Sequence, residues 1–300
     1  MSNAPAKRAL VTGATGFIGG NLAARLQGDG WETHAVIRTT SQAGAVWQVL
    51  GESRVHVHDG STEGMLAIVQ QVQPTHIFHV ASLFLAQHRA DQVTTLVRSN
   101  VEFAAQLAEA AAVVKVPYFI NTGTSWQHFE DAEFNPVNLY AATKEAGAGI
   151  LRYYAEAGVF RVLNLELFDT YGPNDPRPKL FTLLRKAAAS GETLAMSAGD
   201  QLIDLVFIDD ILDAYTTAAE YIAQSSSFNT FAVSSGAPLP LREMVGVWSK
   251  VTGRPLNIQW GARPYRPREV MVPWSRGKSL PSWKPAVGLE RGIRKMEGLA

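Results

Sequence analysis

The sequence contains no cysteine, and this absence excludes disulfide bonds and thiolate chemistry. It is also compatible with a reducing compartment. Long apolar runs are missing too. The N-terminus, MSNAPAKRALV, lacks the apolar core of a signal peptide, and no run approaches membrane-spanning length. We therefore expect a cytoplasmic protein that has no membrane partner.

Neither sign of charge is in excess, since 27 Lys and Arg balance 27 Asp and Glu. The whole molecule therefore gives no electrostatic reason to bind a polyanion, and we expect no nucleic-acid partner. The charge is uneven along the chain, because ten basic residues face three acidic ones from Arg254 onward. Six prolines interrupt this segment, so it is no continuous basic helix, and a small anionic ligand suits it better.

The seven histidines do not form a metal-binding pattern. His56 and His58 have strand spacing, His76 and His79 lie three apart, and no acidic cluster accompanies either pair. Histidines in such positions are more often packed or hydrogen-bonded than bound to a metal, so we expect no metal.

What the chain does have is a regular alternation of β-rich and helical segments over its first half. Apolar residues recur at helical spacing between several of the β-rich runs, as at Ile18, Leu22 and Leu26. The β-rich runs are RALVT (8–12), THAVIR (33–38), RVHVHD (54–59), HIFHVA (76–81), YFINT (118–122) and RVLNLELF (161–168). This alternation predicts an α/β fold with a Rossmann-type, doubly wound parallel sheet.

The alternation weakens after about residue 170, where proline becomes more frequent. We interpret residues 1–170 as a dinucleotide-binding Rossmann domain. Residues 171–201 and 234–300 would form a smaller, interleaved C-terminal substrate-binding lobe. The strand-like runs LIDLVFI (202–208) and FNTFAV (228–233) predict returns to the first domain around 202–233.

The stretch VTGATGFIGG follows the first predicted strand and opens the first predicted helix. Gly13, Gly16 and Gly19 have the spacing G-x-x-G-x-x-G, which allows a tight turn and close approach of the backbone to a diphosphate. N–H groups at the start of the helix, near Phe17, would face that anion. An ordinary strand-to-helix turn is the alternative, but the flanking strand and amphipathic helix favour dinucleotide binding.

Arg38 ends the second predicted strand, where dinucleotide-binding domains read the adenosine ribose. An acidic residue there would favour NAD, whereas Arg can pair with a 2′-phosphate. We therefore predict NADP as the cofactor, with NAD possible; the alternative is that Arg38 only ends a strand in solvent. Asp59, which ends the third strand, is a candidate partner for the adenine amine, although it could equally begin a turn.

Tyr140 and Lys144 are spaced to lie on one face of a helix, one turn apart. A phenol is a poor acid–base group near neutral pH, and a neighbouring ammonium lowers its pKa by favouring the phenolate. Thr122, Thr124 and Ser125 follow an apolar run, and a hydroxyl at a strand end can hold a substrate oxygen beside the phenol. The YxxxK spacing alone is also common in exposed helical pairs.

These motifs occur together and in order: GATGFIGG, Asp59, FHVAS, YFINTGTS, YAATK and FDTYGP. The set resembles the extended short-chain dehydrogenase/reductases, the NAD(P)-dependent nucleotide-sugar epimerase/dehydratase family, from Ala9 to about Pro273. The resemblance implies an enzyme, an NAD(P)-dependent oxidoreductase that has catalytic Ser/Thr, Tyr and Lys residues. It also implies NAD(P) bound in a Rossmann fold.

The resemblance assigns the site residue by residue. The expected catalytic residues are Thr124, Tyr140 and Lys144, with Thr122 and Ser125 as alternatives to Thr124. The expected cofactor-binding residues are Gly13, Thr15, Gly16, Phe17, Ile18, Gly19, Arg38, Asp59, Gly60, Ala81, Ser82, Thr122, Tyr140, Lys144 and Phe168. The expected substrate-binding residues are Ser82, Thr124, Ser125, Asp169, Arg266 and Glu269. Of these, Arg266 lies in RPRE, a segment that resembles the family's diphosphate-gripping R-P-G-D segment.

The chain also departs from the family pattern. Glu166 and Ile203 stand where relatives carry Arg, and Trp126 to His128 replace the usual VYG after the catalytic hydroxyl. This variant resembles in particular the 4-ketoreductases of the CDP-abequose and CDP-paratose synthase group. The implied function is NADPH-dependent reduction of the C4 keto group of a nucleotide-diphospho-4-keto-6-deoxyhexose, giving a deoxysugar nucleotide.

Two other functions remain as alternatives. An NAD-dependent nucleotide-sugar 4-epimerase is the nearest, and Arg38 argues against it. A non-enzymatic NADP-binding sensor is the other, but such proteins tend to lose the Tyr or the Lys. The resemblance also implies a homodimer in which the helices at 101–113 and 141–154 pair across the interface.

Overall fold

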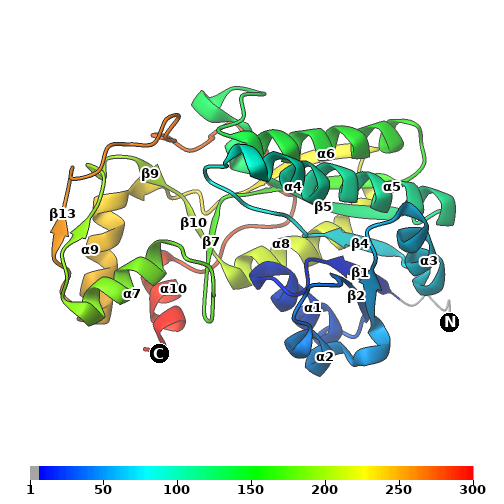
Figure 1. Ribbon diagram of the computed structural model, residues 1–300, viewed down its shortest axis with the longest axis horizontal. Helices are drawn as coiled ribbons and strands as arrows, with labels where there is room; N and C mark the ends of the chain where they lie inside the picture. The colour runs from blue at the N-terminus through cyan, green and yellow to red at the C-terminus, as the bar shows by residue number, and fades with distance from the viewer. Residues whose placement is uncertain (1–6, 300) are drawn as a thin grey trace.

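A seven-stranded, wholly parallel sheet forms the centre of the computed structural model, which describes residues 7–299 (Figure 1). The strands lie in the order β11 (Phe228–Val233), β6 (Arg161–Leu167), β5 (Tyr118–Thr124), β4 (His76–His79), β1 (Arg8–Thr12), β2 (Glu32–Arg38) and β3 (Val55–His58). The predicted Rossmann-type α/β fold is therefore confirmed.

Helices cover both faces of the sheet, because successive strand residues point to opposite sides. Leu10 and Phe119 pack into one helical layer, and Val11 and Ile120 into the other. The first layer consists of α3 (Thr62–Val72), α5 (Phe103–Val114) and α6 (Leu139–Glu156). The second consists of α1 (Phe17–Gly28), α2 (Gly44–Leu50) and α8 (Ile208–Tyr221). Within residues 7–299, no helix is both long and apolar enough to cross a membrane.

A smaller lobe lies at the left of Figure 1. Its helices are α7 (Leu180–Ser190), α9 (Leu241–Thr252) and α10 (Leu289–Glu297). Three short strand pairs accompany them: β7 (Asp169–Tyr171) with β10 (Leu205–Phe207), β9 (Leu202–Ile203) with β12 (Leu239–Pro240), and β8 (Leu194–Ala195) with β13 (Ile258–Gln259). The chain returns to the large sheet through α8 and β11, whereas the run 202–208 stays outside that sheet.

The strand order reverses beside β1, which pairs with β2 on one side and with β4 on the other. Loops leaving the carboxyl ends of β1 and β4 therefore run in different directions and leave a crevice between them. The glycine turn follows β1, the loop that carries Ser82 follows β4, and Thr124 ends β5. This crevice is the place where an open α/β sheet binds its ligand.

Candidate active site

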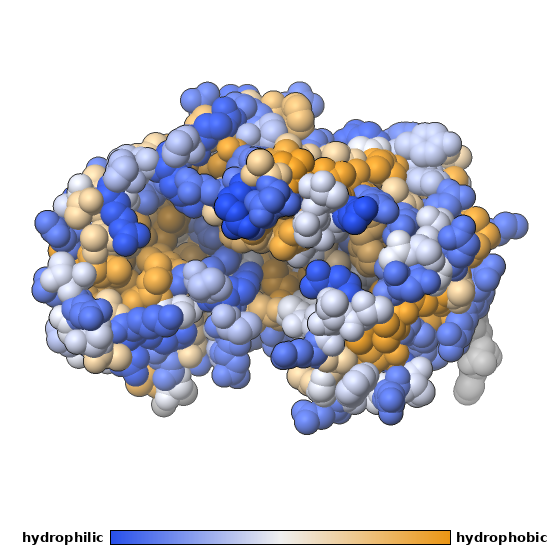
Figure 2. Space-filling model, in the orientation of Figure 1, coloured by the Kyte–Doolittle hydropathy of each residue, from blue (hydrophilic) through white to orange (hydrophobic). Residues whose placement is uncertain are grey.

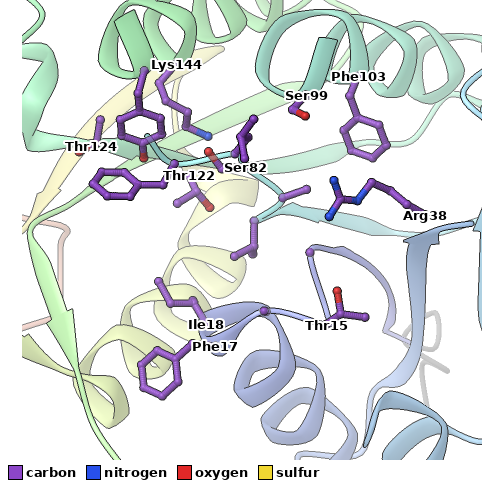
Figure 3. A pocket seen from close by; sticks show the side chains of 18 of the residues that line it. Thr15, Phe17, Ile18, Arg38, Ser82, Ser99, Phe103, Thr122, Thr124 and Lys144 are labelled. Carbon is purple, nitrogen blue, oxygen red and sulfur yellow. The ribbon is translucent and has the colours of Figure 1, made fainter. Parts of the chain in front are cut away.

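A cavity of about 880 Å³ opens at the carboxyl ends of the central strands, within the roughly 300–1,000 Å³ of small-molecule sites (Figure 3). It is lined by every residue that the sequence assigns to cofactor binding and by the three assigned to catalysis. Four of the expected substrate-binding residues line it as well: Ser82, Thr124, Ser125 and Asp169. One cavity thus brings together motifs from six separate segments of the chain.

The glycine turn at one end of the cavity has no room for side chains. Gly13 has a φ of +74°, and a Cβ there would lie 2.7 Å from the backbone nitrogen of Ala81. A Cβ on Gly19 would lie 2.2 Å from the carbonyl oxygen of Gly13. Helix α1 has Gly16 as its N-cap and no side chain that accepts from its first N–H groups. These groups are therefore available to a phosphate, and the turn fits a dinucleotide diphosphate.

Arg38 marks the end of the cavity beyond this turn. Its side chain extends from the end of β2 into the cavity, below Phe103 in Figure 3. Thr39, Thr40 and Ser41 line the same end. The surroundings therefore combine a cation with three hydroxyl groups, a donor set that suits a phosphate ester.

Asp59 is hydrogen-bonded within its own turn. Its Oδ1 accepts hydrogen bonds from the backbone nitrogen and from the hydroxyl of Ser61, both at 2.8 Å. Ser61 in turn caps α3, so Asp59 begins the turn that precedes this helix. Asp59 and Gly60 nevertheless line the cavity. A contact with adenine stays a prediction.

The catalytic candidates meet at the opposite end of the cavity. Tyr140 and Lys144 lie one turn apart on α6, and the hydroxyls of Ser82 and Thr124 are the polar groups next to the Tyr140 hydroxyl. Burial raises the pKa of Tyr140 to about 12, although the neighbouring hydroxyls of Ser82 and Thr124 lower it. Lys144 is only 4% exposed, and burial lowers its pKa to about 8. The expectation that the pKa of Tyr140 is lowered is wrong for the protein alone. Desolvation of the phenolate outweighs the neighbouring groups that favour it.

The Thr124 hydroxyl is free to donate a hydrogen bond to Tyr140 or to a substrate. Its Oγ1 accepts a hydrogen bond from the backbone nitrogen of Trp126 at 3.3 Å, which leaves the hydroxyl hydrogen free to donate. The alternative residue, Thr122, is hydrogen-bonded to the hydroxyl of Tyr215 on α8 at 2.5 Å. The geometry therefore favours Thr124 over Thr122 as the partner of the phenol.

A model of the NAD dependent epimerase/dehydratase family matches residues 9–233. The chain belongs to this family. It is 24% identical to CDP-abequose synthase of Salmonella typhimurium and 27% identical to UDP-glucose 4-epimerase of Mycolicibacterium smegmatis, with 96% of each chain covered in both cases. The crystal structure of the Thermus thermophilus UDP-glucose 4-epimerase complex with NAD is similar at a TM-score of 0.79 and 22% identity, covering 96% of this chain and 97% of that one.

Asn100, which no motif indicated, holds two segments of this epimerase/dehydratase site together but is not among the residues that line the cavity. It is 3% exposed and lies in a π-helical turn (Arg98–Glu102) before α5. Its Oδ1 accepts from the backbone nitrogen of Leu83 at 2.8 Å and from the Ser82 hydroxyl at 3.3 Å. Its Nδ2 donates to Thr143 on α6 at 2.9 Å. Asn100 therefore ties the loop of Ser82 to the catalytic helix; a polar residue inside the apolar stretch NVEFAAQLA was its only signal.

Arg266 and Glu269, expected on the substrate, do not line the main cavity. The Arg266 guanidinium donates hydrogen bonds of 2.9 and 2.7 Å to the Glu269 carboxylate, because the two residues lie three apart in one turn. Arg266 also stacks over the Trp126 ring at 5.6 Å and lines a separate hollow of about 30 Å³. Arg177 and Lys179, which no motif indicated, line the main cavity.

The histidines of this family member have other partners. His56 bonds His34 at 3.0 Å, and His79 bonds the Thr12 hydroxyl at 2.9 Å. Burial lowers the pKa of His79 to about 3, so this ring is neutral. In the described part of the chain, no three His, Cys, Asp or Glu side chains are grouped so that they could hold a metal ion.

Proposed function

We propose that this enzyme uses NADPH to reduce the C4 keto group of a nucleotide-diphospho-4-keto-6-deoxyhexose. The observation that carries the choice is the Arg38 side chain, which extends into the cavity where β2 ends (Figure 3). A 2′-phosphate placed there would gain a charge-assisted hydrogen bond. NADPH that binds and leaves suits a reductase, whereas an epimerase re-uses one bound cofactor.

The side chains at the catalytic end match the needs of a carbonyl reduction. When bound, NADPH supplies the hydride. Tyr140, which stays protonated because its pKa is raised to about 12, donates its proton to the developing alkoxide of the substrate. Thr124 donates a hydrogen bond to the same oxygen, and Lys144 adds positive charge nearby. General acid assistance of this kind contributes roughly 10²–10⁴-fold in rate.

An apolar wall beside these groups supports a 6-deoxy sugar. The ring of Phe84 lies edge-on to Tyr140 at 5.0 Å and 5.6 Å from the ring of Trp126, and both line the cavity. The C5 substituent of the sugar is next to the reacting C4 carbon. A methyl group can rest on such a wall, whereas a carboxylate would lose its hydration without gaining a partner.

The direct test is a spectrophotometric screen of NADPH oxidation against a panel of nucleotide-linked 4-keto-6-deoxyhexoses. One member should be reduced with one NADPH consumed per product. A 4-epimerase would instead interconvert nucleotide hexoses without net consumption, and it would release bound NAD on denaturation. That outcome would replace the reductase by its nearest alternative.

Arg38→Ala should raise the KM for NADPH by about 10–100-fold, because a charge-assisted hydrogen bond to the 2′-phosphate is lost. The KM for NADH should stay within about threefold, since NADH lacks this phosphate. Steady-state kinetics with both cofactors measure the difference. Arg89→Ala is a matched control, because Arg89 pairs with Asp91 on the surface, outside the cavity. An equal rise in KM for NADPH and for NADH would count against NADPH as the cofactor.

We also propose a homodimer, which the family resemblance suggests. Helices α5 and α6 pack side by side, and Val113 and Tyr153 on them are 51% and 68% exposed. Val97 on α4 (Val93–Val97) is 41% exposed, and Figure 2 shows apolar side chains over this face. Light scattering at micromolar concentration should give twice the 32.6 kDa chain mass, and Tyr153→Glu should lower it. A monomeric wild-type mass would contradict the dimer.

A further inference from the structure

Two departures from the family pattern, Glu166 and His128, are each other's partner. His128 Nε2 lies 2.7 Å from Glu166 Oε2, and the two side chains are 9% and 3% exposed. Glu166 lies on β6 opposite Gly123 of β5, and the 3₁₀ turn Ser125–Gln127 directs the chain from β5 to His128. Substitutions that look unrelated in the sequence therefore form one buried unit.

The hydrogen-bond partners of the two ring nitrogens of His128 indicate which of them carries a hydrogen. Nδ1 is 3.0 Å from the carbonyl oxygen of Ala132, which only accepts, so Nδ1 carries a hydrogen. Nε2 faces Glu166, and with this carboxyl ionised Nε2 carries a hydrogen too, which makes the ring an imidazolium. Burial lowers the pKa of His128, but the hydrogen bond and charge of Glu166 outweigh it and leave the pKa above its ordinary value. Burial raises the pKa of Glu166, although the hydrogen bond and charge of His128 lower it.

Hydrogen bonds run from this pair to the catalytic hydroxyl residue. Glu166 Oε1 accepts from Gln127 Nε2 at 3.3 Å and from Asn164 Nδ2 at 3.2 Å. Gln127 is fully buried, and its Oε1 accepts from the backbone nitrogen of Thr124 at 2.9 Å. Gln127 Nε2 also donates to Glu145 on α6 at 2.5 Å. The cluster thus touches both the backbone of Thr124 and the helix that carries the phenol.

Neighbouring segments are shaped to enclose the pair. A Cβ on Gly123 would lie 2.7 Å from Glu166 Cγ, so glycine leaves the space that the carboxylate fills. The ring of Trp274 stacks on His128 with centroids 3.8 Å apart. Asp131 accepts from the backbone nitrogen of Ser275 at 2.7 Å, which fixes the chain next to that Trp. The C-terminal segment therefore covers the His128 ring.

Other charged residues lie on the elements packed on the pair, and the Glu133 side chain among them is exposed. Glu145 approaches from α6, Asp131 and Glu133 belong to the loop of His128, and Arg276 belongs to the C-terminal segment. Arg276 is bound to Asp131 at 2.9 Å. Among residues 7–299, His128 is the one basic side chain within ion-pair distance of Glu166. Removing either side chain therefore leaves the other one buried without its ion-pair partner, and the cluster must rearrange.

Building on the reductase activity proposed above, we propose that the His128–Glu166 pair is a positioning unit for catalysis. It holds Gln127, and through Gln127 it holds the backbone of Thr124, so that the Thr124 hydroxyl faces Tyr140. We expect the pair to have little effect on cofactor binding, because the glycine turn follows β1 and lies two strands away from β5.

Turnover of four variants tests this role. Glu166→Ala and His128→Ala should each lower kcat by about 10–100-fold, since misplacement by about 1 Å has effects of this size. The KM for NADPH should stay within about threefold. The double variant should be no slower than either single variant, because both remove one unit. Glu166→Gln should rescue most of the kcat that Glu166→Ala loses, because its amide can donate to a neutral His128 while its oxygen still accepts from Gln127.

A control and a second measurement separate the possible failures. Glu133→Ala, an exposed residue of the same loop, should leave kcat unchanged. NMR of histidine labelled with ¹⁵N should show hydrogens on both ring nitrogens of His128 at pH 7, and a neutral ring in Glu166→Gln. This measurement needs no substrate, so it stands even if the NADPH screen fails. A neutral ring in the wild-type protein would show that the pair is not an ion pair, and alanine variants that melt earlier yet keep their kcat would overturn the positioning unit.

Discussion

Tyr140→Phe should lower kcat by about 10²–10⁴-fold, the usual contribution of a general acid. The substitution removes only the phenolic hydroxyl, which is the proton donor in the proposed reduction. The ring that remains can keep its edge-on contact with Phe84, so the apolar wall should stay in place. We therefore expect NADPH to bind with a Kd within about threefold of the wild-type value. NADPH oxidation measures kcat, and a fluorescence titration measures Kd.

Tyr153→Phe is the matched control for this experiment. It makes the same chemical change on the same helix, at a side chain that is 68% exposed. Its kcat should equal that of the wild-type enzyme. If Tyr140→Phe also kept its turnover, the proton would have to come from another group, and the catalytic assignment would be wrong. If both the wild-type protein and Tyr140→Phe bound NADPH but neither reduced any substrate, the result would favour the non-enzymatic sensor.

Lys144→Met should remove most turnover and yet stabilise the cofactor-free protein. Burial lowers the pKa of Lys144 from 10.5 to about 8, so at pH 7 the folded protein holds a buried ammonium. Since one pKa unit corresponds to about 1.4 kcal/mol, this burial costs roughly 3 kcal/mol of folding free energy. Methionine has a similar length and no charge, so its free energy of unfolding at pH 7 should be higher by up to that amount.

The stability gain should depend on pH in a defined direction. Below pH 8 the lysine is protonated in both the folded and the unfolded chain, so the wild-type protein bears the full cost. Between pH 8 and 10.5 the folded protein loses this proton first, the unfolded chain binds more protons, and wild-type stability rises with pH. Lys144→Met lacks this rise, so its advantage should shrink as the pH approaches 10.5.

Urea unfolding at pH 7 and pH 10 measures both effects. Lys250→Met, at an exposed position on α9, is the control and should change stability by less than about 0.5 kcal/mol at either pH. A Lys144→Met protein with the same advantage at both pH values would show that the ammonium is not what burial penalises. A loss of stability at pH 7 would show that Lys144 has a stabilising partner.

The strands of the large sheet could be predicted because each is a short apolar run. RALVT and FNTFAV coincide with β1 and β11 to the residue. The run LIDLVFI looked equally apolar, but it forms two short strands around Asp204. The Asp204 carboxylate accepts from the Ser234 hydroxyl at 2.5 Å and from the backbone nitrogen of Ser235 at 2.8 Å. Contacts that far along the chain have no signature in local periodicity.

The site could be predicted where its geometry is local, and not where it depends on packing. The glycine spacing and the pair Tyr140–Lys144 are set by one turn and one helix, and both line the cavity. Arg177 lines the cavity, and Asn100 holds one of its loops, only because of tertiary folding, so no sequence spacing predicts either residue. The helix spacing placed the ammonium near the phenol, but it carried no information about burial, which decides both pKa values. Likewise, RPRE did not reveal that Glu269 would hold Arg266.

The last strand of the central sheet, β11, comes from residues 228–233, after the first part of the smaller lobe, which includes α7, has already been made. During synthesis on a ribosome, one edge of β6 therefore stays unpaired until more than three quarters of the polypeptide has emerged. An open edge of this kind readily pairs with the wrong partner. A gene fragment that stops near codon 170 should for this reason yield aggregates rather than a small nucleotide-binding module. The two lobes therefore have to be encoded together in one chain.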